Sequence, residues 1–345
     1  MPTTPSSAAE TPAAPRPRRT LRRTGRRDGD VWIAGALRAV ATVTLLVLAG
    51  ILLVLMDNGV GAFTGAGDIA VGSLTDAERA LLHERELAQL ARVEAARPTL
   101  GRVFASASWN PTSTHAPAWG VLAMVVSTLG VTALAMGIAI PVGVGIALWL
   151  AWVAPAWARE AFKPVLELLA GVPSVVVGFV GLVLIGPVIA RVFGLPNGLN
   201  ALHGAILLAW MALPTIVAVS EDALRAVPHD YVRASLALGA DRWQTLVRVV
   251  LPAARGGVLA ACMLGVGRAI GETMTVLMAT GNAVALPHGP FDSVRTLTAT
   301  VAIELGEVTV GSTHYRMLFV VGLVLFLITL VVNVLAERFV RGGRA

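Results

Sequence analysis

Six long apolar stretches constrain this sequence more than any other feature. Each is close to the ~20 residues that an α-helix needs to cross the hydrocarbon core of a bilayer. Charged residues make up 14% of the 345-residue chain and the mean hydropathy is +0.75, whereas soluble domains carry about 25% charged residues. The sequence therefore predicts an all-α membrane protein with six transmembrane helices. These helices are expected near residues 33–56, 119–150, 165–190, 203–220, 254–280 and 316–336.

The first 30 residues are rich in Pro, Ala, Ser and Arg, and an apolar run over residues 31–56 follows them. Residues 1–30 offer too little apolar surface to fold, so we predict a disordered tail. A basic tail before an apolar run is also typical of a secretory signal peptide. The run at 31–56 is longer than the about 7–15 residues of a signal-peptide core, and no convincing cleavage site ends it. An uncleaved first transmembrane helix over residues 31–56 is therefore predicted.

The arginines fall mainly on one side of the predicted helices. They gather in the tail, in the loops at 151–164 and 221–253, and after the last helix. Cytoplasmic segments of membrane proteins carry such an excess of Lys and Arg, so both termini are predicted to be cytoplasmic. The formal charge of +6 follows from this orientation and does not indicate nucleic-acid binding.

The longest external segment is then the loop at 57–118. An Ala-, Leu-, Glu- and Arg-rich stretch near residues 74–97 predicts a solvated helix within this loop. Trp119, at the start of the second predicted helix, is expected in the aromatic belt of the membrane interface. The remaining residues, 119–340, form a predicted core of five helices that contains the cytoplasmic loop at 221–252.

A short polar and basic segment, residues 233–252, lies between two of the apolar stretches. It begins with Arg233-Ala234-Ser235, continues after three residues with Gly239 and after nine more with Val249, and ends with Leu251-Pro252. A glycine in such a segment supplies a backbone conformation or a close approach that other residues disfavour. We predict that Gly239 makes the turn between two short helices.

Two ionisable residues, Arg268 and Glu272, lie inside the fifth predicted helix, one turn apart on one face. Charges inside a membrane are costly and usually functional. One interpretation is a structural ion pair, in which each charge neutralises the other. The other is a translocation pathway, in which Arg268 meets an anion and Glu272 orients the arginine. Thr273 adds a hydroxyl to the pathway, although a bond back to the preceding helical turn is its commoner role.

Two proline-containing dipeptides, Pro173-Ser174 and Pro214-Thr215, interrupt other apolar stretches. A proline frees backbone groups of a helix, and these groups can line a polar cavity. Ordinary helix kinks explain the two dipeptides equally well.

Nothing in the sequence indicates a cofactor, metal or nucleotide bound by this chain. The six histidines and the single cysteine, Cys262, form no metal-binding pattern, and no Walker A sequence occurs. The only lysine is Lys163. We therefore predict that the chain is not an enzyme and that any ATP hydrolysis belongs to a partner subunit.

The pattern of residues 233–252 resembles the EAA coupling loop of ABC importer permeases, through which a separate ATPase moves the membrane subunit. In that motif E-A-A is followed by three residues, Gly, nine residues and I-x-L-P. Arg233 replaces the Glu and Ser235 the second Ala, while the glycine and the final Leu-Pro keep their places. The resemblance implies a type I ABC importer permease fold. The residues that it assigns to ATPase coupling are Arg233, Ala234, Ser235, Gly239, Leu251 and Pro252.

Three further segments resemble the phosphate-specific permeases of the Pst system, and within them the PstC-type subunit. They are GRAIGETM at 267–274, ELLAGVPSVVVGFVGL at 167–182 and WNP at 109–111. Together with the coupling loop, the resemblance covers roughly residues 100–340. Within it Arg268 and Glu272 match the arginine and the glutamate of the family. The companion PstA-type permease is the near alternative.

The resemblance implies a transmembrane permease subunit of an ATP-driven phosphate importer in the bacterial inner membrane. A PstA-type permease would complete the pathway, PstB-type ATPase subunits would use ATP, and a periplasmic or lipid-anchored PstS-type protein would deliver inorganic phosphate. A permease for another oxyanion, such as sulfate or molybdate, is the alternative transport function. A membrane enzyme or channel built on Arg268 and Glu272 would leave the coupling loop unexplained.

Overall fold

The structure is a computed structural model that describes residues 28–64, 97–113 and 117–342. The chain divides into two compact units, Met1–Ile51 and Leu52–Ala345. Almost all of the predicted tail at 1–30 and of the predicted external helix near 74–97 lies outside the described residues. The described part contains five helices long and apolar enough to cross a membrane, or six if one sharply bent pair is counted as a single span. This confirms the predicted all-α, six-helix membrane fold.

The first transmembrane helix, α1 (Asp28–Thr64), is longer than the sequence indicated. We expected the span to end near residue 56, where polar residues and glycines begin. The helix continues because its last turns pack against a later helix, α16 (Thr313–Gly342). The carbonyl of Gly61 accepts a hydrogen bond from Nη1 of Arg316 at 3.3 Å. A tertiary contact therefore extends the helix beyond its apolar stretch.

Three helices form the centre of the second unit: α5 (Leu122–Leu148), α9 (Ala201–Arg225) and α13 (Arg255–Gly271). Their shared core is built largely of alanines and small aliphatic residues. A Cβ atom on Gly143 or Gly265 would lie only 2.8 or 2.7 Å from a side-chain carbon of Ile216. Close approach of small residues is how helices associate in lipid, where apolar burial gives little advantage. The backbone of α5 stays helical through Pro141.

The third predicted span, at 165–190, is interrupted. Helix α6 (Ala156–Gly171) ends before Pro173, and α7 (Ser174–Val180) begins after it. The prediction of one helix here is wrong because the residue before a proline is pushed towards extended backbone. The span itself comprises α7, a π-helical turn at Gly181–Ile185 and α8 (Gly186–Phe193).

The polar segment between the fourth and fifth spans folds into short helices. They are α10 (His229–Ala237), α11 (Arg242–Thr245), a π-helical turn at Leu246–Val250, and α12 (Leu251–Ala253). The stretch Arg242–Ala253 is bent by 73° from α13. The segment therefore turns away from the axis of the helix that follows it.

The fifth predicted span, at 254–280, is also broken. Helix α13 ends at Gly271, Glu272 is extended, and α14 (Met274–Ala279) follows. The expectation that Arg268 and Glu272 share one helical face is therefore wrong. The Glu272 carboxylate accepts a hydrogen bond from the backbone N–H of Thr275 in the first turn of α14, at 3.3 Å.

The far end of the bundle holds small elements: α4 (Leu100–Ala105), the hairpin strands β1 (Trp109–Asn110) and β2 (Ala118–Trp119), and α15 (Leu297–Glu304). Trp119 pairs with Trp109 across the hairpin and is only 8% exposed. It is a core residue of this end, and the prediction that it belongs to an interfacial belt is wrong.

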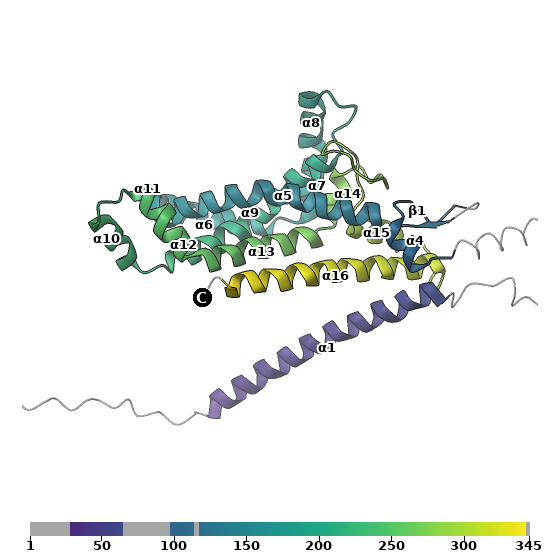
Figure 1. Ribbon diagram of the computed structural model, residues 1–345, viewed down its shortest axis with the longest axis horizontal. Helices are drawn as coiled ribbons and strands as arrows, with labels where there is room; N and C mark the ends of the chain where they lie inside the picture. Colours follow the sequence, from purple (N-terminus) through teal and green to yellow (C-terminus); the bar gives the residue numbers. More distant parts are fainter. Residues whose placement is uncertain (1–27, 65–96, 114–116, 343–345) are drawn as a thin grey trace, which may run out of the picture. The chain divides into compact units, whose positions relative to one another are not determined.

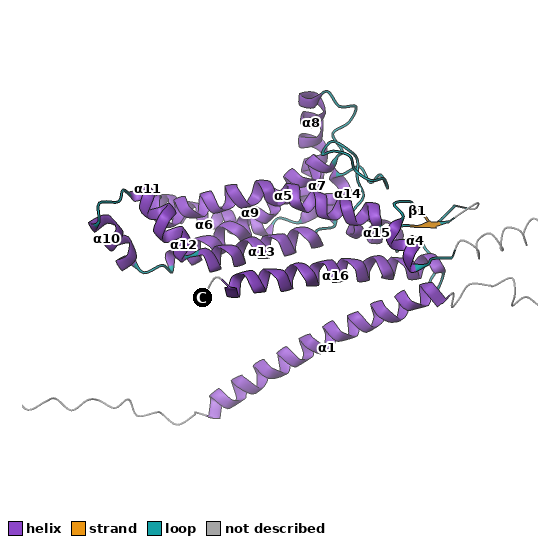
Figure 2. Ribbon diagram, in the orientation of Figure 1, coloured by secondary structure: helices purple, strands orange, loops and turns teal. Residues whose placement is uncertain are grey.

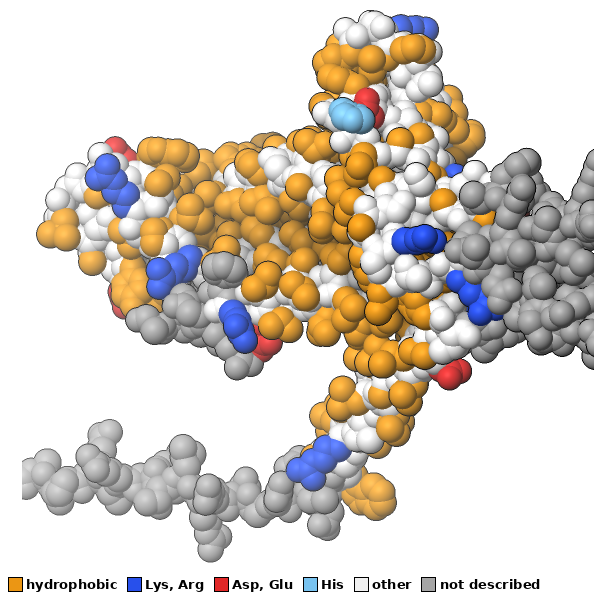
Figure 3. All heavy atoms as spheres, turned by 45° about the vertical axis from the view of Figure 1, so that its right-hand side comes forward, with side chains coloured by type: hydrophobic (Ala, Val, Ile, Leu, Met, Phe, Trp, Pro, Cys, Tyr) orange, Lys and Arg blue, Asp and Glu red, His pale blue; other side chains and the backbone are white. Residues whose placement is uncertain are grey.

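Figures 1 and 2 show how the second unit is ordered along its length. The short helices α10 and α11 and the end of α16 lie at one end, and α4, β1 and α15 lie at the other. The space-filling view shows hydrophobic side chains covering the helices between these ends, with charged side chains around α10 and α11 (Figure 3). This arrangement suits a bundle whose middle faces lipid.

Candidate functional site

The candidate substrate site is the side chain of Arg268, which lies in the last turn of α13. Its Nη1 donates a hydrogen bond to Oγ1 of Thr215 on α9 at 3.2 Å. Its Nη2 donates a longer bond to the carbonyl of Ala170 on α6 at 3.5 Å. Three helices that are far apart in the sequence therefore meet at one guanidinium group.

Local sequence explains why these acceptors are available. Ala170 lies in the last turn of α6, where carbonyl groups have no amide partner inside the helix. Thr215 follows Pro214 within α9. The dipeptides Pro173-Ser174 and Pro214-Thr215, singled out from the sequence, thus lie beside the two groups that hold Arg268.

A cavity of about 360 Å³, with four charged residues among those that line it, opens next to this contact. Both partners of Arg268, Thr215 and Ala170, line it. The residues that form its wall are Lys163, Leu166, Glu167, Ala170, Pro214, Thr215, Ala218, Glu221 and Asp222. Glu221 is 1% exposed, and its carboxylate accepts a hydrogen bond from Nη1 of Arg225 at 3.3 Å. The cavity therefore carries both signs of charge, with the guanidinium of Arg268 close to its wall.

Neither Glu272 nor Thr273 is a side-chain partner of Arg268. Within the described ranges, no salt bridge connects Arg268 with Glu272. The carboxylate of Glu272 caps α14, and its carbonyl accepts a hydrogen bond from Thr298 at 2.9 Å. The hydroxyl of Thr273 donates to the carbonyl of Gly271 at 3.4 Å, close to the local bond considered from the sequence. The structural ion pair left open by the sequence is therefore not formed.

The segment at 233–252 contains the predicted turn. Gly239 lies between α10 and α11 with a φ of 85°, which confirms the prediction. No atom lies within 4 Å of a Cβ built on this glycine. Its role is thus to allow the left-handed backbone conformation, which residues with a side chain rarely adopt.

Side-chain bonds fix the two short helices on either side of this turn. The hydroxyls of Ser235 on α10 and Thr245 on α11 lie 2.9 Å apart and form a hydrogen bond. Asp241 and Gln244 form a reciprocal capping box at the start of α11. Of the other residues assigned to coupling, Arg233, Ala234 and Pro252 are exposed and Leu251 is half-buried.

The same end of the molecule presents large apolar side chains to the outside. Leu238 is 89% exposed and Trp243 is 69% exposed. A cavity of about 330 Å³ lies beside them, with Trp152, Val232 and Trp243 in its wall. Exposed apolar residues next to a shaped recess are typical of a protein–protein contact.

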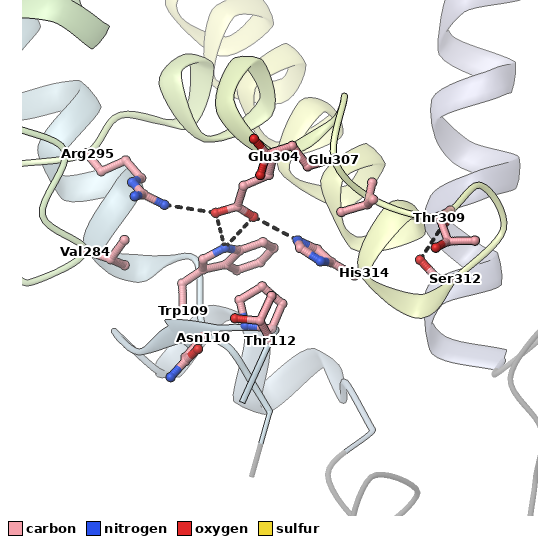
Figure 4. A pocket seen from close by; sticks show the side chains of 12 residues that line it. Trp109, Asn110, Thr112, Val284, Arg295, Glu304, Glu307, Thr309, Ser312 and His314 are labelled. Atoms are coloured by element: carbon pink, nitrogen blue, oxygen red, sulfur yellow. Dashed lines mark hydrogen bonds and ion pairs between the residues drawn. The ribbon is translucent and has the colours of Figure 1, made fainter. Parts of the chain in front are cut away.

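A second polar cluster, at the opposite end, centres on Glu304 (Figure 4). Its carboxylate accepts bonds from Nε1 of Trp109, at 3.0 Å and 3.1 Å to the two oxygens, and from Nη1 of Arg295 at 2.9 Å. Nε2 of His314 lies 2.8 Å from the same carboxylate. The cluster borders a cavity of about 500 Å³. It ties the hairpin, α15 and the start of α16 together.

The loop before α15 holds Arg295 in place for this contact. Nε of Arg295 donates to the carbonyl of Asn282 at 3.0 Å. Within the loop, Asp292 accepts bonds from the backbone N–H groups of His288 and Gly289 at 2.7 and 2.9 Å. These bonds favour the charged carboxylate and lower the pKa of Asp292. Sequence reasoning missed the Glu304 cluster, and only the WNP segment around Trp109 marked any part of it.

Replacing Glu304 by Gln should destabilise this end of the molecule. The amide keeps one acceptor oxygen but turns an N–H₂ group towards donors, and leaving buried donors without a partner costs about 1–3 kcal/mol. We expect a lower melting temperature of the purified protein in detergent. Glu307→Gln is the matched control, because Glu307 lines the same cavity and is exposed. An equal melting temperature for both variants would contradict a stabilising role for the cluster.

These features define a class of protein: a membrane-embedded helical bundle with an open recess beside a half-buried arginine and a set of short helices at one end. Comparison with known proteins gives the family. Residues 143–344 match the model of the binding-protein-dependent transport system inner membrane component. The chain belongs to this family and is a transport subunit.

Two relatives show the extent of the similarity. The probable ABC transporter permease protein YqgH of Bacillus subtilis is 41% identical over 237 residues, covering 68% of this chain and 76% of that protein. The phosphate transport system permease protein PstC 1 of Mycobacterium tuberculosis is 36% identical over 273 residues, covering 69% and 81%.

Two solved structures share the fold. A chain of the MetNI methionine ABC transporter in an inward-facing conformation has a TM-score of 0.51 at 18% identity, covering 64% of this chain and 94% of that one. A chain of a bacterial alginate ABC transporter, solved in complex with an alginate-bound periplasmic protein, has a TM-score of 0.52 at 15% identity, covering 91% and 96%. At this identity the likeness concerns the fold alone.

Proposed function

We propose that this chain is the PstC-type permease subunit of an ATP-driven phosphate importer. The observation that carries the proposal is the guanidinium of Arg268, half-buried inside the bundle and bonded to neutral acceptors. No carboxylate of the described residues lies within ion-pair distance of it. A charge in such a place is expensive unless a counter-charge compensates it. A transported anion would supply that counter-charge.

The chemistry of arginine favours an oxyanion. A guanidinium offers a planar fork of donors that matches two oxygens of a phosphate group, and it stays charged at any physiological pH. Sulfate and molybdate share this geometry, so Arg268 alone does not select among them. Phosphate is favoured because several relatives of this chain, from different bacteria, carry the name PstC.

The proposal includes three kinds of partner. A second, PstA-type permease shares the pathway, PstB-type ATPase subunits bind the segment around Gly239, and an external PstS-type protein delivers phosphate. The exposed apolar side chains of Leu238 and Trp243 support the ATPase contact. The name of the family, binding-protein-dependent transport system inner membrane component, supports the external binding protein. ATP is used by the ATPase, and this chain binds no cofactor of its own.

The proposed mechanism is alternating access. Closure of the ATPase dimer moves the short helices of residues 221–252, and the bent connection at 253–255 transmits the movement to α13. Because Arg268 lies at the other end of α13, this shift changes the side of the membrane to which the guanidinium is open.

The proposed orientation places both termini in the cytoplasm of a bacterial inner membrane. It is supported by the arginine distribution, which places Arg-rich segments at both ends of the chain and in the loops at 151–164 and 221–253. A reporter that works only in the cytoplasm should be active when it is fused after Gly342, and a reporter that works only in the periplasm should be inactive there. A periplasmic signal from this fusion would overturn the orientation.

Competition in uptake tests the substrate. The complete transporter is expressed in cells that lack other phosphate importers, and uptake of radiolabelled phosphate is measured. An excess of unlabelled phosphate should suppress the signal, whereas the same excess of sulfate or molybdate should leave it unchanged. Suppression by sulfate or molybdate would assign the permease to that anion, and an absence of phosphate uptake by the assembled transporter would contradict phosphate as its substrate.

A further inference from the structure

Thr215 occupies an unusual place for a helical threonine. In the middle of a helix, a threonine hydroxyl commonly bonds back to the carbonyl one turn earlier, as Thr128 and Thr329 do in this chain. The hydroxyl of Thr215 instead accepts a hydrogen bond from the guanidinium of Arg268 on another helix. Its β-branched side chain has few rotamers, so the oxygen is held in a defined position.

The carbonyl of Ala170 completes the contact from a third helix. It accepts from the other terminal nitrogen of the guanidinium, and the end of α6 before Pro173 leaves it without an intrahelical partner. The two acceptors therefore occupy one N–H on each of Nη1 and Nη2. The remaining N–H groups of the fork stay available to an anion.

We infer that Thr215 is a positioning residue for anion transport, which seats the guanidinium of Arg268 against the Ala170 carbonyl. This inference rests on the proposed function, in which Arg268 meets the transported anion. A long arginine side chain loses conformational entropy when it is fixed, and a pre-ordered fork avoids that loss during binding. Misplacing a group by about 1 Å can lower a rate by a large factor.

The three groups of this contact also lie on different helices, and in the proposed mechanism α13 moves relative to the other two. Thr215 is on α9 and Ala170 on α6, whereas Arg268 is on α13, the helix joined to the coupling segment. A shift of α13 along α9 therefore separates the guanidinium from its acceptors. Thr215 and the Ala170 carbonyl thus hold Arg268 in one transport state and release it in the other.

The test compares three variants of the complete transporter in proteoliposomes, with saturating binding protein. Thr215→Val removes the hydroxyl but keeps the shape, and Thr215→Ser keeps the hydroxyl. Ser220→Ala is the matched control, because Ser220 is a buried hydroxyl on the same helix for which the described residues offer no hydrogen-bond partner. Uptake of radiolabelled phosphate and formation of ADP are measured together, since phosphate itself is a product of ATP hydrolysis.

The informative quantity is the amount of phosphate moved per ADP formed, per assembled complex. Thr215→Val should lower it about tenfold, the order expected for losing a hydrogen bond to a charged group, while Thr215→Ser and Ser220→Ala stay within about twofold of the parent. In an Arg268→Lys background, Thr215→Val should have a clearly smaller effect, because Thr215 acts through the fork that lysine lacks.

Each other outcome has a definite meaning. An unchanged ratio in Thr215→Val, with Arg268→Gln inactive, would overturn the positioning role and leave the proposed function intact. Full uptake by Arg268→Gln would instead overturn the proposed pathway. If Thr215→Val does not assemble, Thr215→Ala takes its place. Failure of both to assemble, with Thr215→Ser intact, would assign Thr215 to packing and overturn the inference.

Discussion

The Arg268→Gln variant should insert and assemble normally but lose phosphate uptake. Glutamine is shorter and uncharged, and it replaces only the end of a side chain that α9 and α6 contact, so we expect the packing of α13 on α9 to be retained. The positive charge and the forked donors are lost, however, and these are what an oxyanion needs. We expect uptake to fall by at least about 100-fold, because a hydrogen-bonded charge interaction of roughly 3 kcal/mol is removed. The measurement is radiolabelled phosphate uptake, normalised to assembled complex.

Two companions make this test sharp. Arg268→Lys should recover only part of the activity, since a point charge replaces a bidentate fork. Glu272→Gln is the matched control, four residues away, and should keep uptake within about twofold. Its amide oxygen can still accept from the N–H of Thr275 and so preserve the cap of α14.

The double variant Arg268→Gln with Glu272→Gln separates the two interpretations drawn from the sequence. For a pair of mutual neutralisers, removal of both charges should be tolerated better than removal of one. The structure places the two side chains in different roles, so the double variant should be as inactive as Arg268→Gln alone. Restored uptake would show that the charges do act as a pair and would refute the anion contact.

Much of the fold was predictable because one physical quantity, the length of apolar stretches, dominates membrane insertion. The spans at 119–150 and 203–220 were placed within a few residues of α5 and α9. The turn at Gly239 was also predictable, since a glycine in a polar segment has few other uses. These features depend on local sequence, which a reader of the chain can see.

The broken spans were harder to foresee, because each interaction that ends a helix is weak by itself. A helical repeat continues through Gly271, Glu272 and Thr273, and nothing in these letters shows that Glu272 will cap a new helix. The break before Pro173 was visible as a proline. Its consequence was not, because the exposed carbonyl of Ala170 matters only once Arg268 arrives from a distant helix.

The Glu304 cluster illustrates the same limit at long range. Its members, Trp109, Arg295, Glu304 and His314, come from segments up to about 200 residues apart. Each has an ordinary local context: a tryptophan near a loop, an arginine and a histidine in external segments, a glutamate at a helix end. Only the packing of the hairpin against α15 and α16 brings them together, and a single sequence carries no record of that contact.

The Gly239→Val variant should lose the ATPase while the permease stays in the membrane. A φ of 85° is strained for any residue with a side chain and most of all for a β-branched one. The left-handed conformation costs roughly 1–2 kcal/mol per residue. The turn will therefore move to another geometry, which breaks the Ser235–Thr245 contact and misaligns α10 and α11. We expect co-purification of the ATPase and phosphate uptake both to fall about tenfold or more.

Two further variants, Gly239→Asn and Gly256→Val, test whether backbone conformation causes the loss of the ATPase in Gly239→Val. Asparagine tolerates the left-handed region better than other residues, so Gly239→Asn should retain a large share of both activities. Gly256 also has no atom within 4 Å of a built Cβ, but it lies in α13 with ordinary helical backbone. Gly256→Val adds the same side chain without that strain and should behave like the parent. If Gly239→Val co-purified with its ATPase and supported full uptake, the segment around Gly239 would not be the surface through which ATP hydrolysis drives this permease.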